Sequence, residues 1–269
     1  MRLLQFLRTN YREAPSVKEI KRAINGKRCV VNHQTQTFSS YLLAAGDLVV
    51  LEEGGVERKR ALSVLYEDTE LLLVNKPSGV VCDHCLERSL GAELVHRLDK
   101  ETSGVLILSK SAEAQEKMLA LFKERSVRKL YLALVDGIPS QGEGVIDTFL
   151  GRTGGYEGQA IYGTVKAGQG KRAITYWKRL KHGQGASLLG CEPHTGRTHQ
   201  LRVHLSALGH PILGDNQYGK RFACPLRPCR NLLHAYSITF KHPCSGKEIK
   251  VVAPIPVDFK QALDQLTLA

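Results

Sequence analysis

A charged segment that leads directly into an apolar strand is the feature that most constrains the fold of this chain. The segment 96–102 reads His-Arg-Leu-Asp-Lys-Glu-Thr, and the apolar run Val105-Leu106-Ile107-Leu108 follows it closely. A short apolar run bounded by turn residues is typical of a buried strand. The sequence therefore predicts that Asp99, a carboxylate among cations, lies at the edge of a buried sheet, where a reaction centre can form.

Short apolar strands outnumber helices after residue 62. One helix is predicted over 111–124, where Ala114, Met118, Leu121 and Phe122 share a face. Predicted strands occupy residues 71–74, 105–108, 130–135, 173–176, 188–191, 237–240 and 249–252. Because strands predominate in the second half, a regular parallel βαβ arrangement is disfavoured. We expect an α+β fold with a mixed, largely antiparallel sheet.

The first 60 residues are strongly basic, with 11 Lys and Arg against six Asp and Glu. Ser16 and Glu19 form a capping box, and Gly26 is positioned to end the helix that follows it. The helix has an apolar stripe of Val17, Ile20 and Ile24, and short strands are predicted at 29–32 and 47–51. The cations on or just after this helix are Lys18, Lys21, Arg22, Lys27 and Arg28.

These features predict a small N-terminal α/β module over 1–55, a polar linker over 56–61 and a larger domain over 62–269. We expect the five cations of the module to contact phosphate groups. A basic helical cap that packs on the larger domain, without a separate fold, is the alternative.

The formal net charge of +12 favours a polyanionic partner, because lysines and arginines displace counterions from phosphates. Charge alone fits DNA, RNA and anionic membrane surfaces equally. The apolar stretch from Leu3 to Leu7 is too brief for a signal peptide, and no apolar run approaches membrane-spanning length. Seven cysteines without a secretory signal argue against a disulfide framework, so we expect a reducing, cytoplasmic location.

Six short motifs along the chain carry a resemblance to a known family. They are Asn-Lys-Pro-Ser-Gly at 75–79, His-Arg-Leu-Asp at 96–99, Lys-Leu-Tyr-Leu-Ala at 129–133, Thr-Gly-Arg-Thr-His-Gln-Leu-Arg-Val-His-Leu at 195–205, Gly-His-Pro-Ile-Leu-Gly-Asp at 209–215 and Leu-His-Ala at 233–235. Together they resemble the signature of the RluA-type RNA pseudouridine synthases. The segment 24–47 resembles the αL RNA-binding domain of ribosomal small-subunit protein four, which precedes the catalytic domain in many of these synthases.

The resemblance implies an enzyme that isomerises uridine in RNA without a cofactor. It assigns Asp99 as the catalytic carboxylate, Arg202 as its partner and Tyr131 as the residue that packs against the target base. A helix starting at His199 would set Arg202 beside an apolar face formed by leucines, from which it can reach inward. Arg97 and Arg197 are expected to face RNA.

Less specific interpretations remain for each of these residues. An aspartate before a strand is often a turn residue, a tyrosine on a strand is often core, and an arginine on a helix is often solvated. A base-excising hydrolase needs a second acid. Asp215 and Glu101 are the nearest candidates, but we interpret Asp215 as a turn residue and Glu101 as a surface charge.

A non-catalytic RNA-binding or ribosome-assembly factor on the same fold is the other rival, although it would not need Asp99, Tyr131 and Arg202 together. The pairs Cys82/Cys85 and Cys224/Cys229 have zinc-like character but lie far apart in sequence, so we expect no metal. Large-subunit ribosomal RNA is the expected substrate, with transfer RNA as the alternative. We expect no DNA or membrane partner and a monomeric protein.

Overall fold

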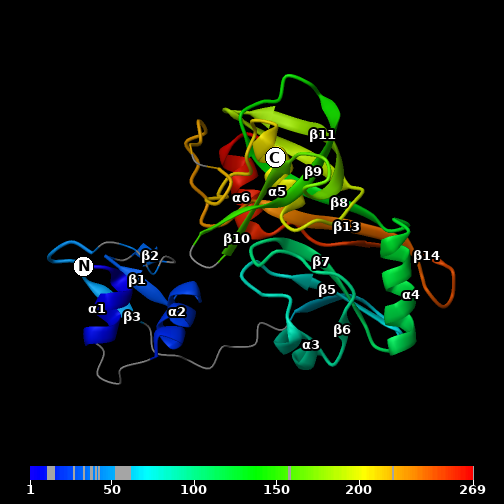
Figure 1. Ribbon diagram of the computed structural model, residues 1–269, viewed down its shortest axis with the longest axis horizontal. Coiled ribbons are helices and arrows are strands. Elements are labelled where there is room, and N and C mark those ends of the chain that lie inside the picture. The colour runs from blue at the N-terminus through cyan, green and yellow to red at the C-terminus, as the bar shows by residue number, and fades with distance from the viewer. Residues whose placement is uncertain are drawn as a thin grey trace. The chain divides into compact units, whose positions relative to one another are not determined.

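The computed structural model describes residues 1–10, 16–26, 28–32, 34–36, 39, 41, 43–51, 62–156, 159–219 and 221–268. The chain divides into two compact units, Met1–Ala61 and Leu62–Ala269 (Figure 1). The predicted linker 56–61 lies outside the described residues, and the division into module and catalytic domain stays a prediction.

The first unit combines two helices with a three-stranded antiparallel sheet in the order β2-β1-β3. Its elements are α1 (Leu3–Asn10), α2 (Val17–Asn25), β1 (Cys29–Val31), β2 (Gln34–Gln36) and β3 (Val49–Leu51). The capping box is present, since Glu19 accepts from the Ser16 amide at 2.7 Å and the Glu19 amide donates to the Ser16 hydroxyl at 3.2 Å. The prediction for Val17 is wrong: it is 40% exposed, while Ile20 and Ile24 are buried beside α1.

The second unit contains one large sheet with the strand order β10-β9-β11-β12-β8-β13-β7-β5-β4, to which β14 and β6 add at β13 and β7. Its strands are β4 (Ser63–Glu67), β5 (Leu71–Lys76), β6 (Glu93–Leu94), β7 (Ser103–Ser109), β8 (Arg128–Asp136), β9 (Glu143–Tyr156), β10 (Gln159–Val165), β11 (Lys171–Gly183), β12 (Ala186–Pro193), β13 (Leu233–Lys241) and β14 (Glu248–Val252). Its helices are α3 (His84–Leu90), α4 (Ala112–Lys123), α5 (Gln200–Ala207) and α6 (Val257–Gln265). The pairing of β13 with β7 is parallel, and the other strand pairs are antiparallel. This confirms the predicted α+β class.

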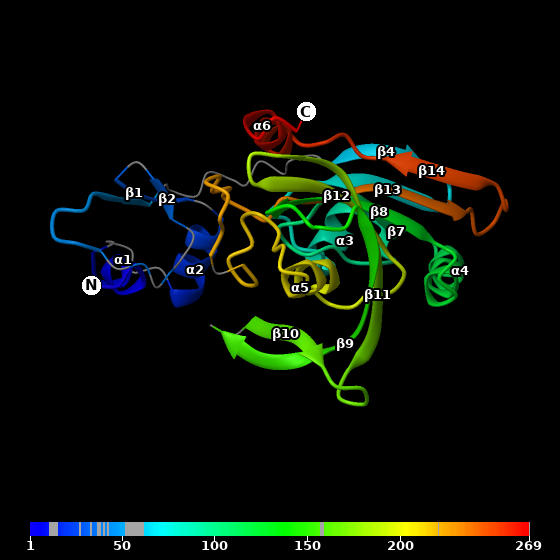
Figure 2. The same ribbon diagram turned by 90° about the horizontal axis from the view of Figure 1, so that it is seen from above.

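Helices cover both faces of this sheet, which explains why β7 is buried along its whole length. Val105 and Ile107 pack in the cluster that contains Met118 of α4, whereas Leu106 and Leu108 pack with Leu86 of α3. Successive side chains of a strand point to opposite faces, so an uninterrupted apolar run is required here. In the other half of the sheet, α5 and α6 pack against opposite faces of β8 and β12 (Figure 2).

Gly104 allows β7 and β13 to approach each other where the charged segment ends. Its φ is +117°, and a Cβ at this position would lie 2.1 Å from the carbonyl oxygen of Ala235. No other residue fits this geometry without strain. Next to it, the Ser103 hydroxyl and the His234 ring nitrogen Nδ1 lie 2.9 Å apart in the core. The glycine thus sets the start of β7, and with it the position of the preceding turn.

Candidate active site

Asp99 lies in a turn that the rest of the protein holds from several sides. Its carbonyl oxygen accepts from the Thr102 amide at 3.1 Å, which closes the turn. The carbonyl oxygen of Lys100 accepts from the Gly79 amide at 2.8 Å and from Lys76 Nζ at 3.1 Å. The turn that carries the carboxylate therefore has a fixed backbone.

Lys76 is a buried cation that acts as an anchor of this turn. Besides Lys100, its Nζ donates to the carbonyl oxygens of Pro77 at 3.1 Å and Val80 at 2.9 Å. Burial lowers the pKa of Lys76 to about 8, while the nearby charge of Asp99 opposes that change. Three acceptors match the three donors of an ammonium group, so the charged form suits this site.

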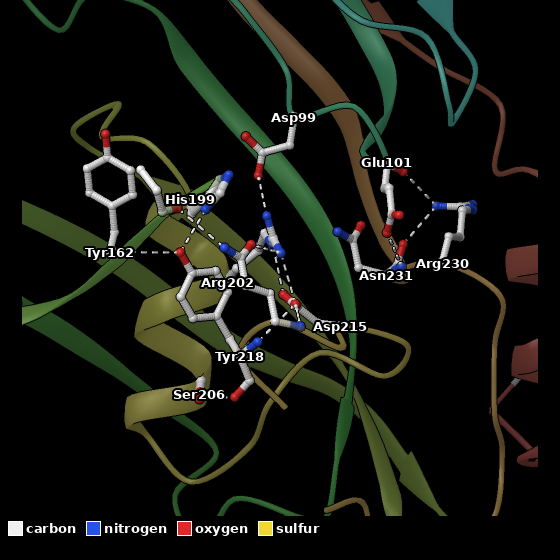
Figure 3. A network of polar contacts seen from close by, with 12 residues as sticks. Asp99, Glu101, Tyr162, His199, Arg202, Ser206, Asp215, Tyr218, Arg230 and Asn231 are labelled. Carbon is white, nitrogen blue, oxygen red and sulfur yellow. Dashed lines mark hydrogen bonds and ion pairs between the residues drawn. The ribbon is translucent and has the colours of Figure 1, made fainter. Parts of the chain in front are cut away.

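Arg202 lies between two carboxylates, as Figure 3 shows. Its Nε and Nη2 donate to the two oxygens of Asp215 at 2.7 and 2.9 Å, while its Nη1 lies 3.5 Å from Asp99 Oδ2. Burial alone would lower the pKa of Arg202, but hydrogen bonds and charges from Asp215, with Asp99, raise it. Arg202 is therefore a permanent positive charge beside Asp99.

The predicted pairing of Arg202 with Asp99 is thus present as a looser contact, and its two-pronged partner is Asp215. Asp215 also accepts at Oδ1 from the amides of Gln217 and Tyr218, at 3.1 and 3.2 Å, as predicted for a turn residue. The interpretation as a turn residue alone was incomplete. The sequence signal that could have found the pair was its place at the end of the 209–215 motif.

Exposure distinguishes the two carboxylates. The Asp99 side chain is 27% exposed, whereas that of Asp215 is 1% exposed. Asp99 can meet a ligand, while Asp215 serves to hold the guanidinium. Gly214, with a φ of +82°, lets this second turn approach Arg230, since a Cβ there would lie 1.9 Å from the Arg230 carbonyl oxygen.

Tyr218 links the arginine to the β9–β10 hairpin. The Arg202 guanidinium lies 4.9 Å from the centre of the Tyr218 ring, and the Tyr218 hydroxyl lies 2.7 Å from His199 Nδ1. The Tyr162 amide on β10 donates to the same hydroxyl at 3.1 Å. Burial and the charge of Arg202 lower the pKa of His199, so a neutral ring can accept a hydrogen bond from the Tyr218 hydroxyl. Sequence reasoning assigned no chemistry to His199 and did not identify Tyr218.

Tyr131 and Lys129 come to the same place from β8. Tyr131 is partly buried between two apolar clusters, and burial raises the pKa of its phenol, which stays protonated at neutral pH. Burial lowers the pKa of Lys129 to about 8, and its Nζ lies 5.8 Å from the centre of the Phe122 ring. Lys129 was noted in the sequence only as part of a motif.

Lys129 and Tyr131 help to line one open pocket of about 110 Å³. Its lining includes the three predicted catalytic residues Asp99, Tyr131 and Arg202, and the two predicted RNA contacts Arg97 and Arg197. Residues separated by a hundred positions in sequence thus surround a single cavity. Glu101, the other candidate acid, lies outside it and accepts from the Asn231 amide at 3.2 Å (Figure 3).

The remaining predicted contacts lie in the first unit. Lys18, Lys21 and Arg22 fall in α2, Arg28 precedes β1, and Lys27 lies outside the described residues. Their role in RNA binding stays a prediction. Within the described ranges, no helix is long and apolar enough to cross a membrane.

Of the four cysteines of the zinc-like pairs, Cys82 and Cys224 are buried, while Cys85 and Cys229 are exposed. No cluster of three or more His, Cys, Asp or Glu side chains that could hold a metal ion occurs among the described residues. The expectation of a metal-free site stays a prediction.

Comparisons with known proteins give consistent results. A profile of the family described as RNA pseudouridylate synthase matches residues 70–207. The ribosomal large subunit pseudouridine synthase D of Zymomonas mobilis is 35% identical over 237 residues, which cover 77% of this chain and 74% of that protein. The protein of the same name from Neisseria meningitidis serogroup A is 37% identical over 245 residues, which cover 79% of this chain but 63% of the relative.

Among solved structures, the human RNA pseudouridylate synthase domain containing 1 is 31% identical and superimposes with a TM-score of 0.65. The match covers 81% of this chain and 98% of the human chain. The family match includes the segment that carries Asp99.

Proposed function

Because the chain belongs to the RNA pseudouridylate synthase family, we propose that it isomerises uridine in RNA to pseudouridine, with Asp99 as the catalytic carboxylate. The reaction cuts the bond from uracil nitrogen to ribose, turns the base and rejoins it through carbon five, without net loss or gain of atoms. The observation that carries the proposal is the exposure of Asp99 in the pocket, beside a buried arginine.

Each residue of the pocket has a part in this proposal. An ionised carboxylate can attack or stabilise the electron-poor centre that forms when the bond to the sugar breaks. Arg202 places a permanent positive charge beside Asp99, and Tyr131 offers a protonated ring as a wall for the base. We also propose that the protein acts as a monomer.

A uridine within folded RNA must leave its stack to reach such a pocket. Arg97 is exposed at the rim, and Lys129 and Arg197 line the same pocket. We propose that these cations hold the phosphates that flank the extruded nucleotide. Contacts of this kind position the RNA without selecting a sequence.

Large-subunit ribosomal RNA in the cytoplasm is our proposed substrate, since relatives that this chain matches are named ribosomal large subunit pseudouridine synthases. Transfer RNA is the alternative. We further propose that the first unit is an RNA-binding module like the αL domain, supported by its capped basic helix and small sheet.

Mapping of pseudouridines tests the activity and the substrate together. Ribosomal and transfer RNA would be compared from cells that lack the chain and from cells complemented with wild type or Asp99→Asn. We expect at least one ribosomal pseudouridine to disappear without the chain, return with wild type and stay absent with Asp99→Asn. A change confined to transfer RNA would overturn the substrate, and restoration by Asp99→Asn would overturn the role of Asp99.

Neutralising three cations of the first unit tests the module in the intact chain. Lys18, Lys21 and Arg28 would be changed to Gln, and the matched control would change the exposed Lys241, Lys247 and Lys250 of the second unit. Each lost phosphate contact lowers the salt dependence of RNA affinity by roughly 0.7–0.9 in log-log slope. We expect this decrease with the first set and little change with the control. Equal behaviour of the two sets would contradict a binding module.

A further inference from the structure

Thr102 carries a buried hydroxyl that has no hydrogen-bond partner in the described part of the chain. The residue is 2% exposed. A buried polar atom without a partner costs about 1–3 kcal/mol, so its presence in a native fold needs an explanation. Its location supplies one, because Thr102 lines the pocket that also contains Asp99, Tyr131 and Arg202.

Nearby hydroxyls differ from that of Thr102, since they are paired. Thr195 lines the same pocket, and its hydroxyl donates to Gln200 Oε1 at 2.7 Å and accepts from the Ile174 amide at 2.9 Å. The hydroxyl of Ser103, one residue further along the chain, lies 2.9 Å from His234 Nδ1. The absence of a hydrogen-bond partner is therefore specific to the Thr102 hydroxyl and is not shared by these neighbouring hydroxyls.

Two other buried side-chain atoms among the described residues lack a hydrogen-bond partner, Asn231 Oδ1 and His242 Nε2. Neither residue lines the pocket, and His242 Nε2 lies 2.9 Å from a carboxylate oxygen of Asp68. Among these three residues, Thr102 is thus the one that lines the pocket.

The backbone of Thr102 is held firmly while its hydroxyl is not. Its amide donates to Asp99 at 3.1 Å, and β7 begins at the next residue. The turn between them is fixed through Lys100 by Lys76 and Gly79. A polar group on so rigid a support is well suited to contact a substrate, since little ordering remains to be done on binding.

We propose that the Thr102 hydroxyl hydrogen-bonds the polar edge of the target uracil from the entry of the base into the pocket until the base is rejoined to its ribose. This inference rests on the proposed function and names a further substrate-contacting residue. The edge of uracil offers two carbonyl oxygens and one N–H, and a hydroxyl both donates and accepts. Entry of the base supplies the partner that the free protein lacks, and the contact retains the base until it is rejoined.

Two substitutions separate this role from a structural one. Thr102→Val keeps the shape of the side chain and removes the hydroxyl, whereas Thr102→Ser keeps the hydroxyl. Because the lost group has no partner, we expect Thr102→Val to unfold at the wild-type temperature or above it. Its kcat/KM on unmodified large-subunit ribosomal RNA should nevertheless fall about tenfold, which is the effect of one lost hydrogen bond. Thr102→Ser should retain most of the activity.

Ser103→Ala is the matched control, because it removes a neighbouring hydroxyl that is paired with His234. We expect Ser103→Ala to lower the unfolding temperature. If Thr102→Val lowered it as much, the hydroxyl would be structural and the proposal would be overturned. Wild-type kcat/KM in Thr102→Val would overturn it too.

A binding measurement identifies what the hydroxyl touches. In the Asp99→Asn background, Thr102→Val should weaken binding of a stem-loop that carries the mapped uridine, and should leave unchanged the binding of one whose target nucleotide lacks its base. Equal weakening of both would assign the hydroxyl to the RNA backbone, against the proposal. A shifted pH profile of kcat at unchanged KM would assign it to Asp99, also against it. Failure of the proposed function would appear earlier, as no pseudouridine formed by the wild-type chain.

Discussion

Two turns from distant parts of the chain bring a carboxylate to the same arginine, and they differ in burial and in hydrogen bonding. The turn at 99–102 leaves Asp99 27% exposed and 3.5 Å from Arg202. The turn at 213–218 buries Asp215, which makes two hydrogen bonds to the guanidinium and two to backbone amides. The same functional group thus occurs once as an accessible group in the pocket and once as a buried support.

The difference shows how one arginine can serve a reaction without being displaced by it. An ion pair at the surface contributes little to stability and does not fix the side chains. A buried pair with two parallel hydrogen bonds holds both side chains in one geometry. Because Asp215 and Gln217 hold Arg202 in position, its remaining donors face Asp99 and the pocket. Positive charge is therefore present beside Asp99 whether or not RNA is bound.

Replacing each carboxylate by an amide should affect different properties, kcat for Asp99 and the free energy of unfolding for Asp215. We expect Asp99→Asn to lower kcat by a factor on the order of 10⁴ with nearly unchanged stability, because the reacting group is lost and its surroundings are half open. Asp215→Asn should lower the free energy of unfolding by about 3 kcal/mol, since it leaves a buried guanidinium poorly paired. Urea unfolding and single-turnover kinetics on the same RNA measure both effects.

A destabilised Asp99→Asn beside an inactive but fully stable Asp215→Asn would reverse the assignment. The acid that acts in the reaction would then be Asp215. RNA affinity is the internal control, since phosphate contacts lie elsewhere and should survive in Asp99→Asn.

The strands of the sheet and the helix α4 could largely be predicted from sequence, because the spacing of apolar residues indicates which side chains are buried. The predicted helix 111–124 is α4, and Ala114 and Met118 on its predicted face are buried. The strand at 105–108 is the centre of β7. The hairpin of β9 and β10 was missed, because its exposed, glycine-bearing sequence lacks a sustained apolar pattern.

The pocket could be predicted only in part. Motif resemblance selected Asp99, Tyr131 and Arg202, and they do line one cavity. The partnership of Arg202 with Asp215 depends on a turn brought close by Gly214, and the unpaired hydroxyl of Thr102 depends on every neighbouring atom. Such facts belong to the three-dimensional arrangement, and spacing along the chain carries no record of them.

Substitution of Arg202 should sharpen the comparison, because the residue touches both turns. Arg202→Met leaves Asp215 buried without its main partner, so we expect a loss of about 3 kcal/mol in stability and roughly a hundredfold in kcat. Arg202→Lys keeps the charge but cannot make the two-pronged contact, and both losses should be smaller.

The double variant Arg202→Met with Asp215→Asn is the control. Since each single change breaks the same contact, the double variant should lose clearly less stability than the sum of the losses in the two single variants. Strict additivity would mean that the two side chains do not depend on each other. Wild-type kcat in Arg202→Met would exclude any action of this charge on Asp99.

The smallest expected effect concerns Lys129, which lines the same pocket as Asp99. Because burial lowers its pKa to about 8, its positive charge is present below that pH and is lost as the pH rises through it. RNA affinity should therefore fall a few-fold between about pH 7 and pH 9, the change that one lost phosphate contact produces. Lys129→Arg should remove this dependence, because a guanidinium stays charged, and Lys129→Met should bind weakly at both ends of the range.

The stability of the free protein should depend on pH in the opposite direction. The unfolded chain retains the lysine proton up to about pH 10.4, so the stability contributed by this residue rises with pH above 8. Burial also lowers the pKa of Lys76 to about 8, so a rise in stability alone does not single out Lys129. Loss of the pH dependence of affinity in Lys129→Arg would identify Lys129 as the titrating group, whereas an unchanged pH profile in Lys129→Arg would assign the titration to another residue.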